Sequence, residues 1–136
     1  MNNALIKDAL FLSLGISHDP KNLIGDLVWM DGCRIHSCHE KAAVIADMKT
    51  KHLQATGLLH FNCRLTVLTQ DNSKAAAQSQ PSTTECDKEA TLDMFVIRRP
   101  AASTKPTDES RLLDEIRTWA KAAGYARENV RVLEVR

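Results

Sequence analysis

The pattern of apolar and polar positions predicts a chain made mostly of short strands, with helices near its two ends. In residues 55–70 apolar and polar side chains alternate, as in an antiparallel strand with one face in water. Short apolar runs predict four further strands, at residues 23–30, 41–48, 90–100 and 130–135. Because only a polar turn separates 41–48 from 55–70, these segments are expected to pair as neighbours in a meander.

Two segments have apolar residues at helical spacing. Residues 3–14 read as an amphipathic first helix. A second helix is expected to open with the acidic turn after Thr107 and to stop at Gly124. Its apolar stripe comprises Leu112, Leu113, Ile116, Trp119, Ala120 and Ala123. The chain is therefore predicted to be α+β, with a roughly five-stranded, mostly antiparallel sheet and two helices packed on one face.

Size and composition fit one domain spanning residues 1–136. Within it, residues 70–89 are rich in Ser, Thr, Gln and Ala without periodicity, and are expected to form an exposed loop. The net charge of +1 argues against a nucleic-acid or membrane-surface partner, which would call for a basic excess. No apolar run approaches the roughly 18 residues that a membrane span requires.

The stretch DGCRIHSCHEK, residues 31–41, concentrates the residues that could carry chemistry. Its central loop comprises Cys33, Arg34, Ile35, His36, Ser37 and Cys38. The chain has four cysteines, which permit three pairings. The shortest ring joins Cys33 to Cys38 and leaves Cys63 to pair with Cys86, a connectivity that the sequence alone leaves open.

A metal site and a thiol site are two interpretations of this loop. Structural zinc sites usually combine two Cys/His knuckles, and no second knuckle of similar spacing follows the C-x4-C pair. Thioredoxin-type chemistry needs C-x-x-C at a helix N-terminus, whereas this pair is expected between strands. A small Cys/His metal-binding or thiol protein is kept as an alternative, but the prediction is a chain without metal, cofactor or catalytic residue.

A disulfide-clasped loop that is displayed to a partner fits these residues better. Closing a ring of this size removes only about 2 kcal/mol of denatured-state entropy, so global stability is a poor reason for the clasp. Its advantage is local, because a loop that is already ordered loses less entropy on binding. Arg34 and His36 would face outward and suit a partner with an acidic cleft.

The loop also resembles a known family. Cys33-Arg34-Ile35-His36-Ser37-Cys38 is similar to the C-K-P-H-D-C loop of the inhibitor of vertebrate lysozyme family, periplasmic proteins of Gram-negative bacteria. Ala43-Val44, the polar turn at 49–52 and Thr56-Gly57-Leu58 follow at nearly the family's offsets. The resemblance covers about residues 27–61; Ile35 stands where the family has proline, Ser37 where it has aspartate, and the second half of the chain does not match.

The resemblance implies a single lysozyme-inhibitor-like domain without catalytic activity, periplasmic or secreted, whose leader is absent from the given sequence. Its partner would be a lysozyme or a lysozyme-like glycoside hydrolase. His36 would enter the active-site cleft and meet the catalytic carboxyl groups, Arg34 would replace the family's lysine, and Cys33 and Cys38 would form the clasp. An immunity protein directed at a lysozyme-like bacterial toxin is the alternative within the same scaffold, and a homodimer is left open.

Overall fold

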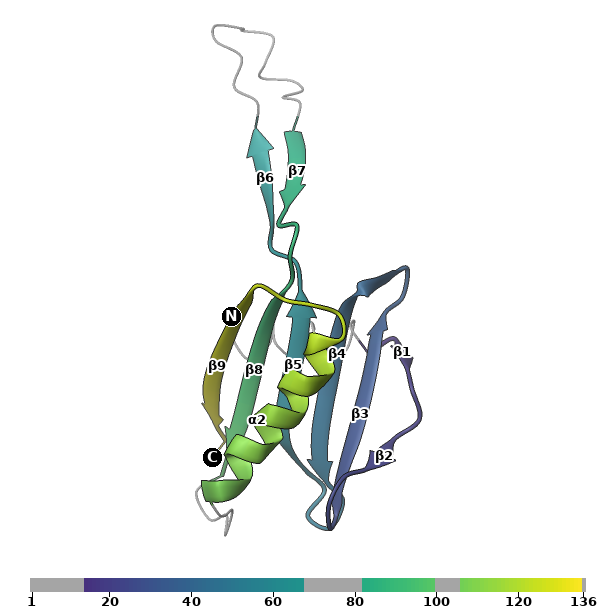
Figure 1. Cartoon of the computed structure of the whole chain (residues 1–136), viewed down its shortest axis with the longest axis vertical. Coiled ribbons are helices and arrows are strands. Elements are labelled where there is room, and N and C mark those ends of the chain that lie inside the picture. Colours follow the sequence, from purple (N-terminus) through teal and green to yellow (C-terminus); the bar gives the residue numbers. More distant parts are fainter. Residues whose placement is uncertain (1–13, 68–81, 100–105, 136) are drawn as a thin grey trace, which may run out of the picture.

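The structure is a computed structural model that describes residues 14–67, 82–99 and 106–135 (Figure 1). The strands in chain order are β1 (Ile16–Ser17), β2 (Lys21–Asn22), β3 (Leu27–Arg34), β4 (Ser37–Asp47), β5 (His52–His60), β6 (Cys63–Val67), β7 (Ser82–Cys86), β8 (Thr91–Arg98) and β9 (Arg127–Glu134). The described helix is α2 (Pro106–Lys121).

Seven of these strands form one mixed sheet in the order β1-β3-β4-β5-β8-β9, with β2 also paired to β3. The pairs from β1 to β8 are antiparallel, as expected of a meander. β9 runs parallel to β8, because α2 crosses over the sheet between them and returns the chain to its starting end. β6 and β7 form a separate two-stranded sheet, the β6–β7 ribbon, which continues beyond one end of the main sheet (Figure 1).

The core lies between the main sheet and α2, which crosses one face of it (Figure 1). The buried side chains on the helix are Leu112, Ile116 and Ala120, and those on the sheet include Ile45, Leu59, Leu92 and Met94. Trp29 of β3 meets Trp119 edge to face, with ring centroids 5.9 Å apart. The predicted helical stripe therefore packs on the sheet, except for Ala123. That residue is exposed beyond the helix end, where Gly124 adopts a φ of +79°.

The prediction of a roughly five-stranded sheet with two helices on one face is wrong. The described residues contain one helix and a sheet of seven strands, plus the ribbon. β1 and β2 have two residues each, which is too short for periodicity to reveal. The first predicted helix, residues 3–14, falls outside the described residues except for Leu14. The sheet is also mixed, because the last strand follows a helical crossover.

Residues 55–70 do not form one strand with a wet face, as their alternation predicted. The chain leaves the strand conformation after β5 and enters β6 at Cys63. Within β5, residues 55–59 are all buried, because the sheet is covered on both faces there. On the face away from α2, Leu58 packs with Ala42 and Phe95 in a second apolar cluster. Part of the expected 70–89 loop, Ser82–Cys86, is a strand of the ribbon, and 68–81 lies outside the described residues.

Candidate functional site

The predicted loop is the tip of the β3–β4 hairpin. Arg34 pairs with Ser37, so Ile35 and His36 form the connection between the two strands. The register shifts between Cys33, which pairs with Lys41, and Arg34, so β4 carries a bulge beside the tip. The Cys33–Cys38 disulfide closes this irregular end, with the two Cα atoms 4.7 Å apart. The hairpin tip is therefore fixed at its base by a covalent bond.

His36 sits at the end of this hairpin in an uncommon backbone conformation. Its φ is +65°, in the left-handed region, which costs a residue other than glycine about 1–3 kcal/mol. Histidine is among the side chains that are enriched there. His36 is exposed, and the neighbouring Ile35 is 52% exposed. The turn therefore presents an imidazole and an apolar side chain to the outside.

Arg34 is held rather than free. Its Nη1 donates a hydrogen bond to Oε2 of Glu40 at 2.8 Å, across the bulge of β4. Its side chain remains 47% exposed, so the pair contributes little to stability, about 0–1 kcal/mol. The sequence predicted an outward-facing cation here; the structure places it beside a carboxylate that partly offsets its charge. For Ser37, the structure gives the backbone pairing alone.

A carboxylate beneath the loop ties the first strands to β3. Asp31 Oδ2 accepts a hydrogen bond from the Trp29 indole at 2.6 Å, and its Oδ1 lies 2.6 Å from Nδ1 of His18. Burial alone would raise the pKa of Asp31, but the hydrogen bonds from Trp29 and His18 outweigh it and hold that pKa below its ordinary value. Because Asp31 precedes Cys33 by two residues, this contact supports the base of the hairpin.

We expect Asp31→Asn to reduce stability at neutral pH and to have less effect in acid. A lowered pKa in the folded state contributes stability above the unfolded value of about 3.9, and that stability is lost as pH falls through the folded value. Because His18 is 75% exposed, we expect a loss on the order of 1 kcal/mol at pH 7. The urea midpoints of the wild type and of Asp31→Asn, measured between pH 7 and pH 2.5, give this difference in stability. A difference that is the same at every pH would contradict the lowered pKa of Asp31.

The second disulfide joins Cys63 to Cys86, which face each other at the base of the β6–β7 ribbon. The pairing with the shortest ring is therefore confirmed, and all four cysteines are bonded. Two disulfides are typical of proteins from an oxidising extracellular or periplasmic environment. The sequence did not predict the ribbon; the available signal was the short stretch beside each cysteine, CRLTV and STTEC, which contains residues with β propensity.

The described residues contain no group of three or more His, Cys, Asp or Glu side chains that could hold a metal ion. Cys33 and Cys38 are bonded to each other, so neither is a thiolate ligand or nucleophile in this form. The described histidine–carboxylate pairs are His18–Asp31 and His60–Asp93, the second joined by Asn129. No described helix is long and apolar enough to cross a membrane.

Comparisons of the chain with family models, with curated proteins and with solved structures gave no match. The geometry of the clasped loop is therefore the main support for a function.

Proposed function

We propose that the chain is a proteinaceous inhibitor of a lysozyme or lysozyme-like muramidase, and that the Cys33–Cys38 loop enters the active-site cleft with His36 leading. The observation that carries the proposal is the exposed His36, held at a φ of +65° at the end of a disulfide-clasped hairpin. Positive φ values are common in two-residue hairpin connections, so this conformation fixes the direction in which the tip presents His36. In this function the chain does no chemistry, since the muramidase supplies the reacting groups.

The chemistry of the target suits an imidazole. Lysozyme-type hydrolysis needs one protonated and one ionised carboxyl group, which flank the sugar about 5–5.5 Å apart in retaining enzymes. A ring with two nitrogens can hydrogen-bond to both groups, and bonds to the ionised one are strengthened by charge. His36 would then occupy the place of the substrate and disturb the required protonation pattern.

Pre-ordering and apolar contact would add to this interaction. Ordering a free backbone costs about 1–2 kcal/mol per residue, and the clasp places most of that cost on folding rather than on binding. Ile35 is 52% exposed, and burying its side chain in the wall of a cleft would contribute up to about 1.5–3 kcal/mol. The family that the loop resembles has proline at the position of Ile35, where it would stiffen the loop. In this chain the position instead offers an exposed apolar side chain.

We infer that the protein works in the periplasm or outside the cell, where disulfides persist and where muramidases act on the cell wall. A homodimer is not required, because one loop per chain is sufficient to block one cleft. The direct test is the rate of cell-wall lysis by c-, g- and i-type lysozymes with and without the protein. Inhibition of a lysozyme-like bacterial toxin alone would favour the immunity protein, and inhibition of no muramidase would refute the proposal.

Removing the clasp should weaken binding more than folding. We expect Cys33→Ser/Cys38→Ser to raise the Kd for a c-type lysozyme by about tenfold or more, because the loop must then be ordered on binding. The expected loss of stability is about 2 kcal/mol, which a core of this size tolerates. Calorimetric titration gives the Kd, and a melting curve of the free protein shows that the variant is folded. An unchanged Kd would contradict the role of the clasp.

A further inference from the structure

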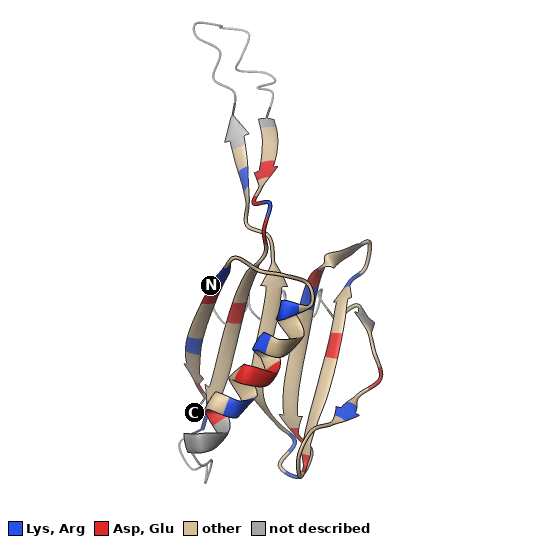
Figure 2. Cartoon of the chain, viewed as in Figure 1, with Lys and Arg blue, Asp and Glu red and all other residues tan. Residues whose placement is uncertain are grey.

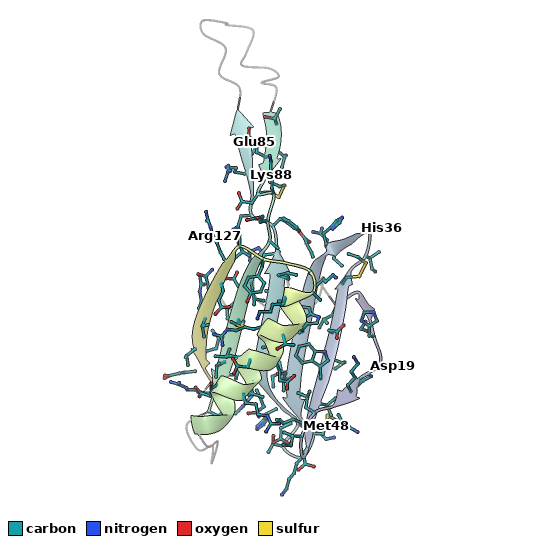
Figure 3. All side chains as sticks on the ribbon, in the orientation of Figure 1. Asp19, His36, Met48, Glu85, Lys88 and Arg127 are labelled. Atoms are coloured by element: carbon teal, nitrogen blue, oxygen red, sulfur yellow. A yellow bond between two sulfur atoms is a disulfide. The ribbon has the colours of Figure 1, made fainter. Side chains whose placement is uncertain are left out.

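Both disulfides lie at one end of the main sheet, each at the base of a hairpin that projects from it. β3 ends and β4 begins at this end, which places the His36 tip there. β5 also ends there and β8 begins there, so the β6–β7 ribbon leaves the sheet beside the loop (Figure 1). Side chains in Figure 3 show the same arrangement, with His36 and the ribbon's Glu85 at one end and Met48 at the other.

The β6–β7 ribbon extends away from the main sheet, and its described residues do not belong to the buried core. Its described side chains are exposed, and Leu65 is 65% exposed. A two-stranded hairpin is marginally stable by itself in water. Here it is anchored by the Cys63–Cys86 disulfide, by Arg64 Nη2 at 3.5 Å from Asp87 Oδ1, and by a backbone hydrogen bond from Asp87 to Asn62. These contacts hold the two strands of the ribbon together at its base, while both of its faces are left open.

The two hairpins are also connected at their bases. His39, just after the clasped loop on β4, meets Phe61 edge to face between β5 and β6, with ring centroids 6.4 Å apart. β4 and β5 are adjacent strands, and adjacent strands lie about 4.8 Å apart. A globular partner seated on the loop is therefore within reach of the ribbon.

The size of a specific interface requires more surface than the loop offers. Stable protein complexes bury about 800 Å² on each partner, usually contributed by about 20–30 residues. A tip of two residues, Ile35 and His36, supplies a small part of that area. A muramidase held by His36 must therefore also contact surface next to the loop, and the ribbon is the part of this end that extends beyond the main sheet (Figure 1).

We propose that the β6–β7 ribbon is a second contact for the same muramidase that receives the Cys33–Cys38 loop, an inference that rests on the proposed function. The contact would centre on the apolar Leu65, with the hydroxyl group of Thr84, its partner on the facing strand and therefore on the same face of the ribbon. The nearby charges have opposite signs and partly cancel, since Arg64 lies 4.0 Å from Glu85. Figure 2 shows both signs on the ribbon. Such a surface fits the uncharged polar and apolar rim beside a cleft, while His36 meets the acidic centre.

The test compares two exposed apolar residues at opposite ends of the sheet. Leu65→Glu alters the ribbon, and Met48→Glu alters the turn between β4 and β5, where Met48 is 46% exposed. The Kd of each variant is measured by calorimetric titration with the lysozyme that the wild type inhibits, a c-type lysozyme first. We expect Leu65→Glu to raise the Kd by about tenfold or more and Met48→Glu to change it by less than about twofold. Melting curves show that both variants are folded.

Hydrogen exchange gives a reading that does not depend on a variant. Amides of residues 63–67 and 82–86 in the wild-type protein should exchange more slowly in the complex than in the free protein. A wild-type Kd for Leu65→Glu, with unchanged exchange in the ribbon, would overturn the second contact. If in that case His36→Asn abolished binding, the ribbon contact would be refuted and the proposed inhibitor function would stand. Failure of the wild type to bind any muramidase would remove both proposals.

Discussion

Replacing His36 with asparagine should abolish inhibition of the target lysozyme and leave the fold unchanged. Asparagine tolerates the left-handed conformation that this position requires, so the loop should keep its shape. The variant loses the hydrogen bonds of the imidazole to the two catalytic carboxyl groups; the bond to the ionised group contributes about 1.5–3 kcal/mol and the bond to the protonated group about 0.5–1.5 kcal/mol. Together the two bonds correspond to an increase in Kd of about thirtyfold or more. Lysis assays and calorimetric titration measure the effect.

Further substitutions separate the chemistry of His36 from its conformation. Glycine relieves the strain at a φ of +65°, whereas alanine keeps it, at about 1–2 kcal/mol. If the imidazole is the binding group, Asn, Gly and Ala should all lose inhibition. If only the loop shape matters, Asn and Gly should inhibit normally and Ala alone should be weaker. His52→Asn is the matched control, because His52 is an exposed histidine at the opposite end of the sheet.

The largest expected effect on stability is that of Gly57→Ala. Gly57 lies in the buried part of β5, directly under α2, and a Cβ added there would be 2.5 Å from Cγ2 of Ile116. Carbon atoms pack at about 3.5–4.0 Å, so either the helix or the strand must move. Overpacking of this kind costs about 1–3 kcal/mol, and the central position of Gly57 places it near the upper end. Urea unfolding at pH 7 measures the change.

A double-mutant cycle tests the cause of this effect. In an Ile116→Ala background the clashing methyl group is gone, so the additional cost of Gly57→Ala should be small. Gly25→Ala provides a contrast. Gly25 has a φ of +56° with no atom within 4 Å of an added Cβ, so its cost should be conformational, about 1 kcal/mol, and independent of Ile116. Equal costs of Gly57→Ala in both backgrounds would contradict the close approach of α2.

Much of the fold could be predicted from the sequence because apolar runs mark strands that are buried. β3, β4, β8 and β9 overlap the four strands predicted from apolar runs, although β9 is largely exposed, and α2 follows its apolar stripe. The short strands β1 and β2 could not be predicted, since they are defined by their pairing with β3 and have two residues each. The prediction of a solvent-exposed face for residues 55–70 was wrong. Residues 55–59 are buried on both faces of the sheet, and burial of the second face depends on packing between segments far apart in the sequence.

The candidate site was predicted as far as local sequence determines it. The spacing of Cys33 and Cys38 between two apolar runs indicated a clasped hairpin tip, and the structure has one. The left-handed conformation of His36 and the Arg34–Glu40 pair follow from the register shift, which no local pattern revealed. The support of Asp31 by His18 joins residues 13 positions apart. Such contacts are set by sheet pairing rather than by sequence spacing.

The location of both disulfides at one end of the sheet separates the maturation of the protein into two stages. The buried apolar side chains of α2, β4, β5 and β8 are Ile, Leu, Val, Met, Phe and Ala, and none of the described buried residues is a cysteine. Collapse of this core therefore needs no oxidant. Both projecting hairpins are closed by disulfides, so we expect a reduced chain to be folded and, on the proposed function, to bind its target less tightly. On the proposed function, an oxidising environment would then strengthen recognition by a molecule whose core is already assembled.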